Sequence, residues 1–234
     1  GNIQTAVYGC SYYSKEIMDP VYDSARPEHR QKYEILLAHG GDDRHIPMKV
    51  NQIQSLGYDY VAMGHIHKPQ ELVENHMAYA GALEPIDIND TGTHGYIEGR
   101  ISEKGCQIRF VCHASREYIH KDVQVHRAMT GHNLKQELVR MIEENGRQNM
   151  YKITLTGFRD PDIWYDLEQM DPCGNVVEIV DHTKPAYDFE KLSNENKGNI
   201  LGQYIESLKG YPQDSIEYQA LCEGVQALME TRRG

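Results

Sequence analysis

The sequence predicts an α+β fold that opens with a parallel β-α-β unit. Residues 33–38 and 60–63 are short apolar runs with the length of buried strands. Residues 47–56 between them have apolar side chains at helical spacing, with Pro47 near the start and Gly57 as the stop. Strand, helix and strand in this order are typical of two parallel strands joined by a crossover helix.

The segments around this unit read mainly as strands. Residues 3–9 form an apolar run before it, and alternating patterns follow at residues 76–80, 95–102, 106–113 and 117–125. Turn residues such as Gly105 separate the later runs, which indicates an antiparallel meander. We therefore expect residues 1–115 to form a sandwich of sheets flanked by helices, of which this chain holds only part.

Two further segments are predicted after residue 115. Residues 116–185 alternate between strand patterns (150–156, 176–180) and helix patterns (132–145, 162–170), which suits a small α+β domain. Residues 186–234 read as a helical tail with helices at 188–195, 197–209 and 214–231. The aromatic pair Trp164 and Tyr165 is expected to pack in the core rather than to stack on bases.

Composition narrows the class of protein. Five scattered cysteines without Cys-x-x-Cys spacing favour reduced thiols in a cytoplasmic protein over a disulfide framework. No apolar run reaches 18 residues, so no membrane span is expected. The net charge of −11 is spread over both halves, which argues against strong autonomous binding to nucleic-acid phosphates.

Histidines follow both strands of the β-α-β unit. His39 comes directly after the first strand and is followed by Gly40, and Gly64-His65-Ile66-His67 follows the second. The carboxyl ends of parallel strands meet at one edge, where sites are commonly built. In an extended backbone His65 and His67 would share a face about 7 Å apart, a spacing suited to two metal ions. Gly40 and Gly64 are expected to leave room beside the ions.

A simpler interpretation of these histidines is that they are surface side chains after strands. The strand-like His113, His120 and His126 and the loop histidine His45 show no ligand spacing, and we expect them to be surface or hydrogen-bonded residues. The motif at residues 64–67 differs from these histidines because it lies at the end of a predicted strand.

Three stretches of the chain resemble the calcineurin-like metallophosphoesterases, and among them the SbcD-like nuclease subunits of DNA-repair complexes. They are residues 37–40, 60–67 and 79–85. In the last stretch Ala80 and Ala82 stand where the repair-nuclease branch usually has proline and serine. The resemblance covers residues 1–120 well and the remainder loosely.

The resemblance implies a two-metal site in which His39 and His65 bind one ion and His67 the other. The implied ions are divalent, with manganese favoured. The family also has an Asp-x-His motif near the start, a Gly-Asp-x-x-Asp motif and an Asn-His-Asp motif, and none of them precedes His39 here. Residues 41–45 do not replace them, because they follow His39. We therefore expect the amino-terminal half of the phosphoesterase domain to be missing, no catalytic proton donor in this chain, and no activity of the chain alone.

The function implied is the carboxyl-terminal portion of a metal-dependent DNA-repair exonuclease. Its expected partners are DNA, an SbcC-like coiled-coil ATPase and a second copy of the chain in a homodimer. Two alternatives remain: a phosphatase or phosphodiesterase of the same fold acting on small molecules, and a non-catalytic interaction module.

Overall fold

The computed structural model describes residues 4–231, which form two compact units. One unit runs to Ile119 and includes Gln148–Met150; the other contains His120–Arg147 and the chain from Tyr151 onward. The predicted division into domains 1–115, 116–185 and 186–234 concerns independent folding, which this grouping does not test, so it stays a prediction.

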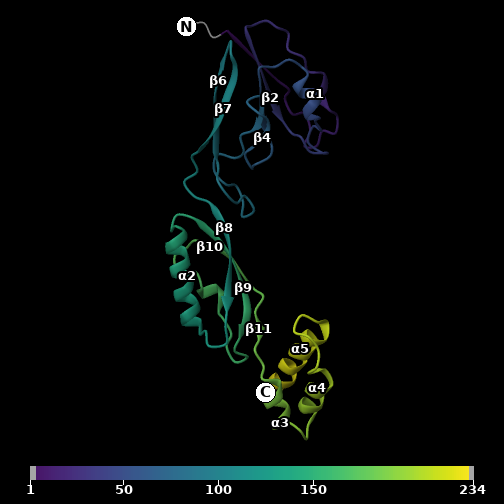
Figure 1. Cartoon of the computed structure of the whole chain (residues 1–234), viewed down its shortest axis with the longest axis vertical. Coiled ribbons are helices and arrows are strands. Elements are labelled where there is room, and N and C mark those ends of the chain that lie inside the picture. Colours follow the sequence, from purple (N-terminus) through teal and green to yellow (C-terminus); the bar gives the residue numbers. More distant parts are fainter. Residues whose placement is uncertain (1–3, 232–234) are drawn as a thin grey trace. The chain divides into compact units, whose positions relative to one another are not determined.

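The first unit is built on a five-stranded sheet with the order β1-β2-β3-β5-β4. All neighbours are parallel except β4, which runs antiparallel to β5. The short helix α1 lies in the chain between β2 and β3, as the sequence predicts (Figure 1). The bounds are β1 Thr5–Gly9, β2 Tyr33–His39, α1 Val50–Gln54, β3 Tyr60–Gly64, β4 Gln70–Val73 and β5 Met77–Tyr79.

One face of this sheet holds the core of the unit. Leu36 of β2 and Val61 of β3 are fully buried and pack with Ile53 of α1. On the opposite face, Leu37 of β2 is 53% exposed and Val7 of β1 is similarly open, whereas all of β5 is buried. Successive side chains of a strand point to opposite faces, so β1 and β2 present one covered and one open apolar surface.

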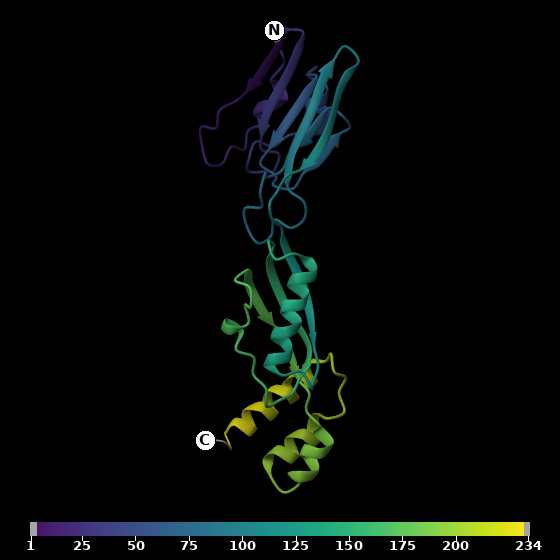
Figure 2. The same cartoon turned by 90° about the vertical axis from the view of Figure 1, so that its left-hand side faces the viewer.

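A two-stranded hairpin, β6 (Gly95–Ser102) and β7 (Gly105–Cys112), completes the first unit. Its turn contains Gly105, as predicted, with φ of 106°. The hairpin runs alongside the sheet (Figure 2), and the Ile108 amide donates to the Asn75 side chain at 2.9 Å. A single 3₁₀ turn, Val21–Ser24, precedes β2.

The second unit contains a four-stranded sheet and helix α2. Strand β9 pairs with β8, β10 and β11, and α2 begins with a capping box between Thr130 and Asn133. Leu134, Leu138 and Ile142 form the buried stripe of α2. The bounds are β8 Tyr118–Val125, α2 Gly131–Asn145, β9 Met150–Arg159, β10 Val176–Asp181 and β11 Lys184–Pro185.

The predicted helical tail is present within the described residues. Helices α3 (Phe189–Glu195), α4 (Ile200–Leu208) and α5 (Ile216–Glu230) share a small core of Leu201, Ile205, Leu221 and Val225. Over residues 4–231, no helix has both the length and the apolar character that a membrane crossing requires.

Two expectations for residues 162–170 are wrong. Only one 3₁₀ turn, Leu167–Gln169, forms there, and the Ile163 carbonyl oxygen of the expected helix accepts from the Arg159 guanidinium at 3.1 Å. Trp164 is 63% exposed rather than packed in the core, and the Arg159 guanidinium lies over its ring at 4.4 Å, whereas Tyr165 is buried as predicted. The predicted α+β class is confirmed at the level of its mixed strands and helices.

Candidate metal centre

The carboxyl ends of β2 and β3 bring His39 and His65 together. The two strands are parallel and in a register that pairs His39 with Gly64. The imidazole rings of His39 and His65 consequently lie 5.3 Å apart between centroids. A Cβ at Gly64 would come within 3.0 Å of His39 Nδ1, so glycine leaves the space that this imidazole needs.

A tight loop after His39 folds back onto this edge. Gly40 and Gly41 have φ values of 139° and 120°, which L side chains rarely adopt. A Cβ at Gly40 would collide with the carbonyl oxygen of His45, and the Gly41 amide donates to that same oxygen at 2.8 Å. The fold-back carries Asp42 and His45 next to His65.

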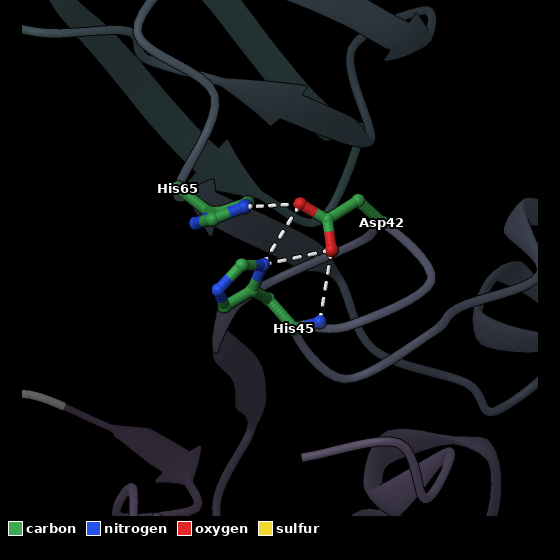
Figure 3. Close-up of side chains that lie close together, drawn as sticks. All are labelled: Asp42, His45 and His65. Carbon is green, nitrogen blue, oxygen red and sulfur yellow. Dashed lines mark hydrogen bonds and ion pairs between the residues drawn. The ribbon is translucent and has the colours of Figure 1, made fainter. Parts of the chain in front are cut away.

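Asp42 accepts hydrogen bonds from two imidazoles (Figure 3). Its Oδ2 lies 2.7 Å from His65 Nε2, and its Oδ1 lies 2.8 Å from His45 Nδ1. The backbone amides of Arg44 and His45 also donate to Oδ1. The hydrogen bond from His65 and the amide of Arg44 hold the pKa of the Asp42 carboxyl well below its usual range.

Tyrosine hydroxyls hold the backbone at His39. The His39 amide donates to Tyr22 Oη at 3.3 Å, and Tyr12 Oη donates to the His39 carbonyl oxygen at 3.1 Å. Burial lowers the pKa of the His39 imidazole, and the neighbouring His65 and His45 lower it further. The neutral imidazole, which is the form that binds metals, is therefore favoured at His39.

Tyr79 also holds the loop after His39 in place. Its buried hydroxyl donates to the Gly40 carbonyl oxygen at 2.8 Å. Burial raises the pKa of this hydroxyl, so the donor keeps its proton. A Cβ at Gly41 would collide with the Tyr79 hydroxyl, which explains the second glycine of the loop.

His67 belongs to a different group of side chains. Its Nδ1 lies 3.0 Å from Asp90 Oδ2, which also accepts the Ile86 amide at 2.9 Å. Partial burial acts to raise the pKa of the Asp90 carboxyl, but the hydrogen bonds from Ile86 and His67 outweigh it and lower the pKa. Asp87 lies close enough to complete a second set of donor atoms.

The expected extended geometry at residues 65–67 is wrong. Strand β3 ends at Gly64, and His65 has a φ of 102°, so the chain bends there instead of alternating its side chains. The bend directs His65 towards Asp42 and His67 towards Asp90, whereas Ile66 packs against the core as predicted.

Within residues 4–231, two groups have the donor atoms for a metal ion. They are Asp42, His45 and His65, and His67, Asp87 and Asp90, with donor atoms within 4.8 Å of one another in each group. Imidazole and carboxylate ligands suit manganese, iron or zinc, so these residue types fit a divalent metal without selecting one. His39 adjoins the first group through its contact with the His65 ring.

Four of these residues are not among the ligands that the sequence predicts. Asp42 lies in residues 41–45, which do not match the family's aspartate motif, His45 shows no ligand spacing, and Asp87 and Asp90 lie in no recognised pattern. The available signal was Gly40-Gly41, because a pair of glycines after a strand-end histidine permits a sharp reversal that brings the next few side chains back to the strand edge.

The comparisons with known proteins agree with a metal-dependent class. No protein-family model matches the chain. A protein of Bacillus subtilis (strain 168) named "Uncharacterized metallophosphoesterase YhaO" is 32% identical over 99 residues, which cover 39% of this chain and 24% of that protein. The matched region thus spans about a quarter of the relative's length. The similarity supports the metallophosphoesterase superfamily for this chain.

Proposed function

We propose that this chain is the carboxyl-terminal portion of a metal-dependent DNA-repair exonuclease of the SbcD-like kind. The observation that carries the proposal is the pairing of His39 and His65 at the carboxyl edge of parallel strands, in a chain similar to a metallophosphoesterase. His67 follows His65 by two residues and belongs to the second group of donor atoms, with Asp87 and Asp90.

The residues of this chain would bind and orient the metals rather than transfer protons. His39 and His65 would hold one divalent ion and His67 the other, with manganese as the proposed metal. When bound, the ions would supply charge stabilisation for the phosphoryl oxygens and a water activated for attack. The tyrosines around His39 fix its backbone, which keeps the imidazole placed before a metal arrives.

The proposed site needs ligands beyond those in this sequence. A two-metal phosphoesterase of the resembled family also uses an Asp-x-His, a Gly-Asp-x-x-Asp and an Asn-His-Asp motif, and no such motif precedes His39 in this sequence. We propose that groups outside the described residues complete the site and cover the open face of the sheet. DNA and an SbcC-like ATPase are the proposed partners of the completed enzyme, and a homodimer is the proposed state of this chain.

Hydrolysis of linear DNA with added Mn²⁺ tests the proposal in two forms of the protein. The chain alone is expected to give no turnover. A chimera in which a metallophosphoesterase amino-terminal half with the three absent motifs precedes this chain is expected to hydrolyse DNA. His65→Ala and His67→Ala should each reduce that rate more than about 100-fold, because each removes a metal ligand.

His113→Ala is the matched control, since the His113 ring makes an edge-to-face contact with Tyr96 of the hairpin and lies in neither donor group. Histidine-dependent hydrolysis by the chain alone would contradict the incomplete site. A near-normal rate of His67→Ala in the chimera would contradict the assignment of one imidazole to each ion.

A phosphatase or phosphodiesterase acting on small molecules is the second candidate, because the name of the Bacillus subtilis relative specifies phosphoester chemistry without a substrate. In that case the chimera should cleave bis(p-nitrophenyl) phosphate but leave linear DNA intact. Hydrolysis of neither substrate would favour the non-catalytic interaction module.

A further inference from the structure

One set of metal donors lies entirely within two short segments of this chain. Asp42 and His45 come from the loop after β2, and His65 follows β3. We propose that, in the chain alone, these three side chains form a self-contained site for one divalent transition metal, in which His65 is a ligand together with Asp42 and His45 instead of with His39. The proposal deepens the proposed function, on which it rests for the kind of ion bound.

The distances among the three side chains fit a shared ion. Two imidazoles and one carboxylate on one side of a metal are a known ligand set for divalent iron and related ions. With metal–ligand bonds of about 2.1 Å, neighbouring donors of an octahedral shell lie about 3.0 Å apart. From the single oxygen Asp42 Oδ2, the separations are 2.7 Å to His65 Nε2 and 2.9 Å to His45 Nδ1, so a small outward movement admits the ion.

The imidazole rings are arranged to share that ion. Their centroids are 4.4 Å apart with the ring planes tilted by 39°, and both rings face the carboxylate (Figure 3). The three side chains remain between 21% and 45% exposed. Solvent therefore reaches the group, and coordination positions remain for water or a substrate oxygen.

The loop backbone prepares the carboxylate for this role. The amides of Arg44 and His45 donate to Asp42 Oδ1, which fixes the carboxylate orientation without help from a metal. Binding needs a lone pair at His65 Nε2 and His45 Nδ1, so the proton at each of these atoms moves to the other ring nitrogen or leaves to solvent. The ion then replaces the protons that now bridge the carboxylate and the rings.

A different role for Asp42 would be to orient His65 while a metal binds elsewhere on that ring. Carboxylates commonly do this for metal-bound histidines. Such a carboxylate has one imidazole to orient, whereas Asp42 contacts two imidazoles from separate segments. The double contact favours a ligand over an orienting partner.

Titration of the whole chain with Co²⁺, followed by calorimetry and by visible absorption, tests the site. We expect a bound equivalent that is lost, or weakened more than about 100-fold, in Asp42→Asn, His45→Gln and His65→Gln. Loss of an orienting partner costs about 10- to 100-fold. His113→Gln is the matched control because it makes the same change at a histidine that lies in neither donor group, and His39→Gln tests the pairing of His39 with His65.

Retention of the Co²⁺ spectrum in His39→Gln and His113→Gln, with loss in Asp42→Asn, His45→Gln and His65→Gln, supports the proposal. Retained binding in His45→Gln, or loss in His39→Gln with retention in Asp42→Asn, overturns it. No binding by the unmodified chain, with circular dichroism showing it folded, also overturns it. None of these results depends on hydrolysis. A failure to bind Co²⁺ at these three residues would therefore not decide whether the chimera cleaves DNA.

Discussion

The two faces of the five-stranded sheet are made by the same strands but have different surroundings. On one face Leu36 and Val61 lie in a closed core with α1. On the other, Leu37 and Val7 are largely exposed although they are apolar, and Leu37 lines the same open surface pocket as His39. Parallel sheets are normally covered on both faces. The covered face stabilises the unit, whereas the open face of β1 and β2 leaves apolar side chains in solvent beside the candidate metal centre.

Adjacent leucines of β2 give the largest expected contrast. Leu36→Ala should lower the free energy of unfolding by about 3 kcal/mol, because it empties a fully buried position. Leu37→Ala makes the same change one residue later on the open face and should cost less than about 1 kcal/mol. Urea unfolding of both variants, at concentrations low enough to keep the chain monomeric, measures the difference, and equal losses would mean that the open face is covered within the monomer.

Association through the open face is the next effect in size. We expect the chain to form a homodimer that buries this face, since exposed apolar surfaces and free sheet edges tend to be covered. Leu37→Lys should weaken dimerisation at least about 10-fold, or 1.4 kcal/mol, in light scattering over a range of concentrations. Ile216→Lys, on the exposed surface of α5, is the control. A monomeric unmodified chain at high concentration would contradict the expectation.

Two tyrosine hydroxyls separate support of the site from support of the core. Tyr79→Phe removes the donor to the Gly40 carbonyl oxygen and should cost about 1 kcal/mol of stability. Tyr58→Phe removes a comparable bond to the Ala25 carbonyl oxygen, away from the metal loop. Both should lower the unfolding midpoint, but only Tyr79→Phe should also weaken Co²⁺ binding. An equal effect of both on metal affinity would mean that the loop does not depend on Tyr79.

The smallest expected effect is the acid sensitivity of the metal-free chain. The folded-state pKa of Asp42 lies below its ordinary value of 3.8, so its contribution to stability is present above pH 3.8. That contribution is lost as the pH falls through the lowered folded-state pKa. In Asp42→Asn, thermal unfolding should therefore depend less on pH in this acid range. An unchanged pH profile would show that the hydrogen bonds of Asp42 do not persist in solution.

Much of the fold could be predicted because its strands carry clear periodicity. Residues 95–102 were predicted as a strand and form β6, and the helix expected at residues 132–145 is α2. Strand β4 was missed because its four residues show little alternation. The expected helix at residues 162–170 is absent, and a long-side-chain contact that periodicity does not reveal is found there instead: the Arg159 guanidinium donates to the Ile163 carbonyl oxygen.

The candidate site could be predicted only where it follows strand register. Pairing of β2 with β3 was enough to expect His39 near the Gly64-His65 segment. Asp42 and His45 could not be placed, because their position depends on the reversal at Gly40-Gly41 and not on a repeating pattern. Asp90 was missed for a similar reason: its contact with His67 joins two loops across 23 positions of sequence.

The bend at His65 has a consequence for selection experiments. A non-glycine residue at a φ of 102° carries strain of about 1–3 kcal/mol, which glycine would relieve. A library of variants screened for heat resistance alone should therefore enrich glycine at position 65 and discard the imidazole. Heat resistance thus favours glycine at this position, whereas metal binding requires histidine. A screen for heat resistance alone would select a more stable protein that lacks a ligand of the candidate metal centre.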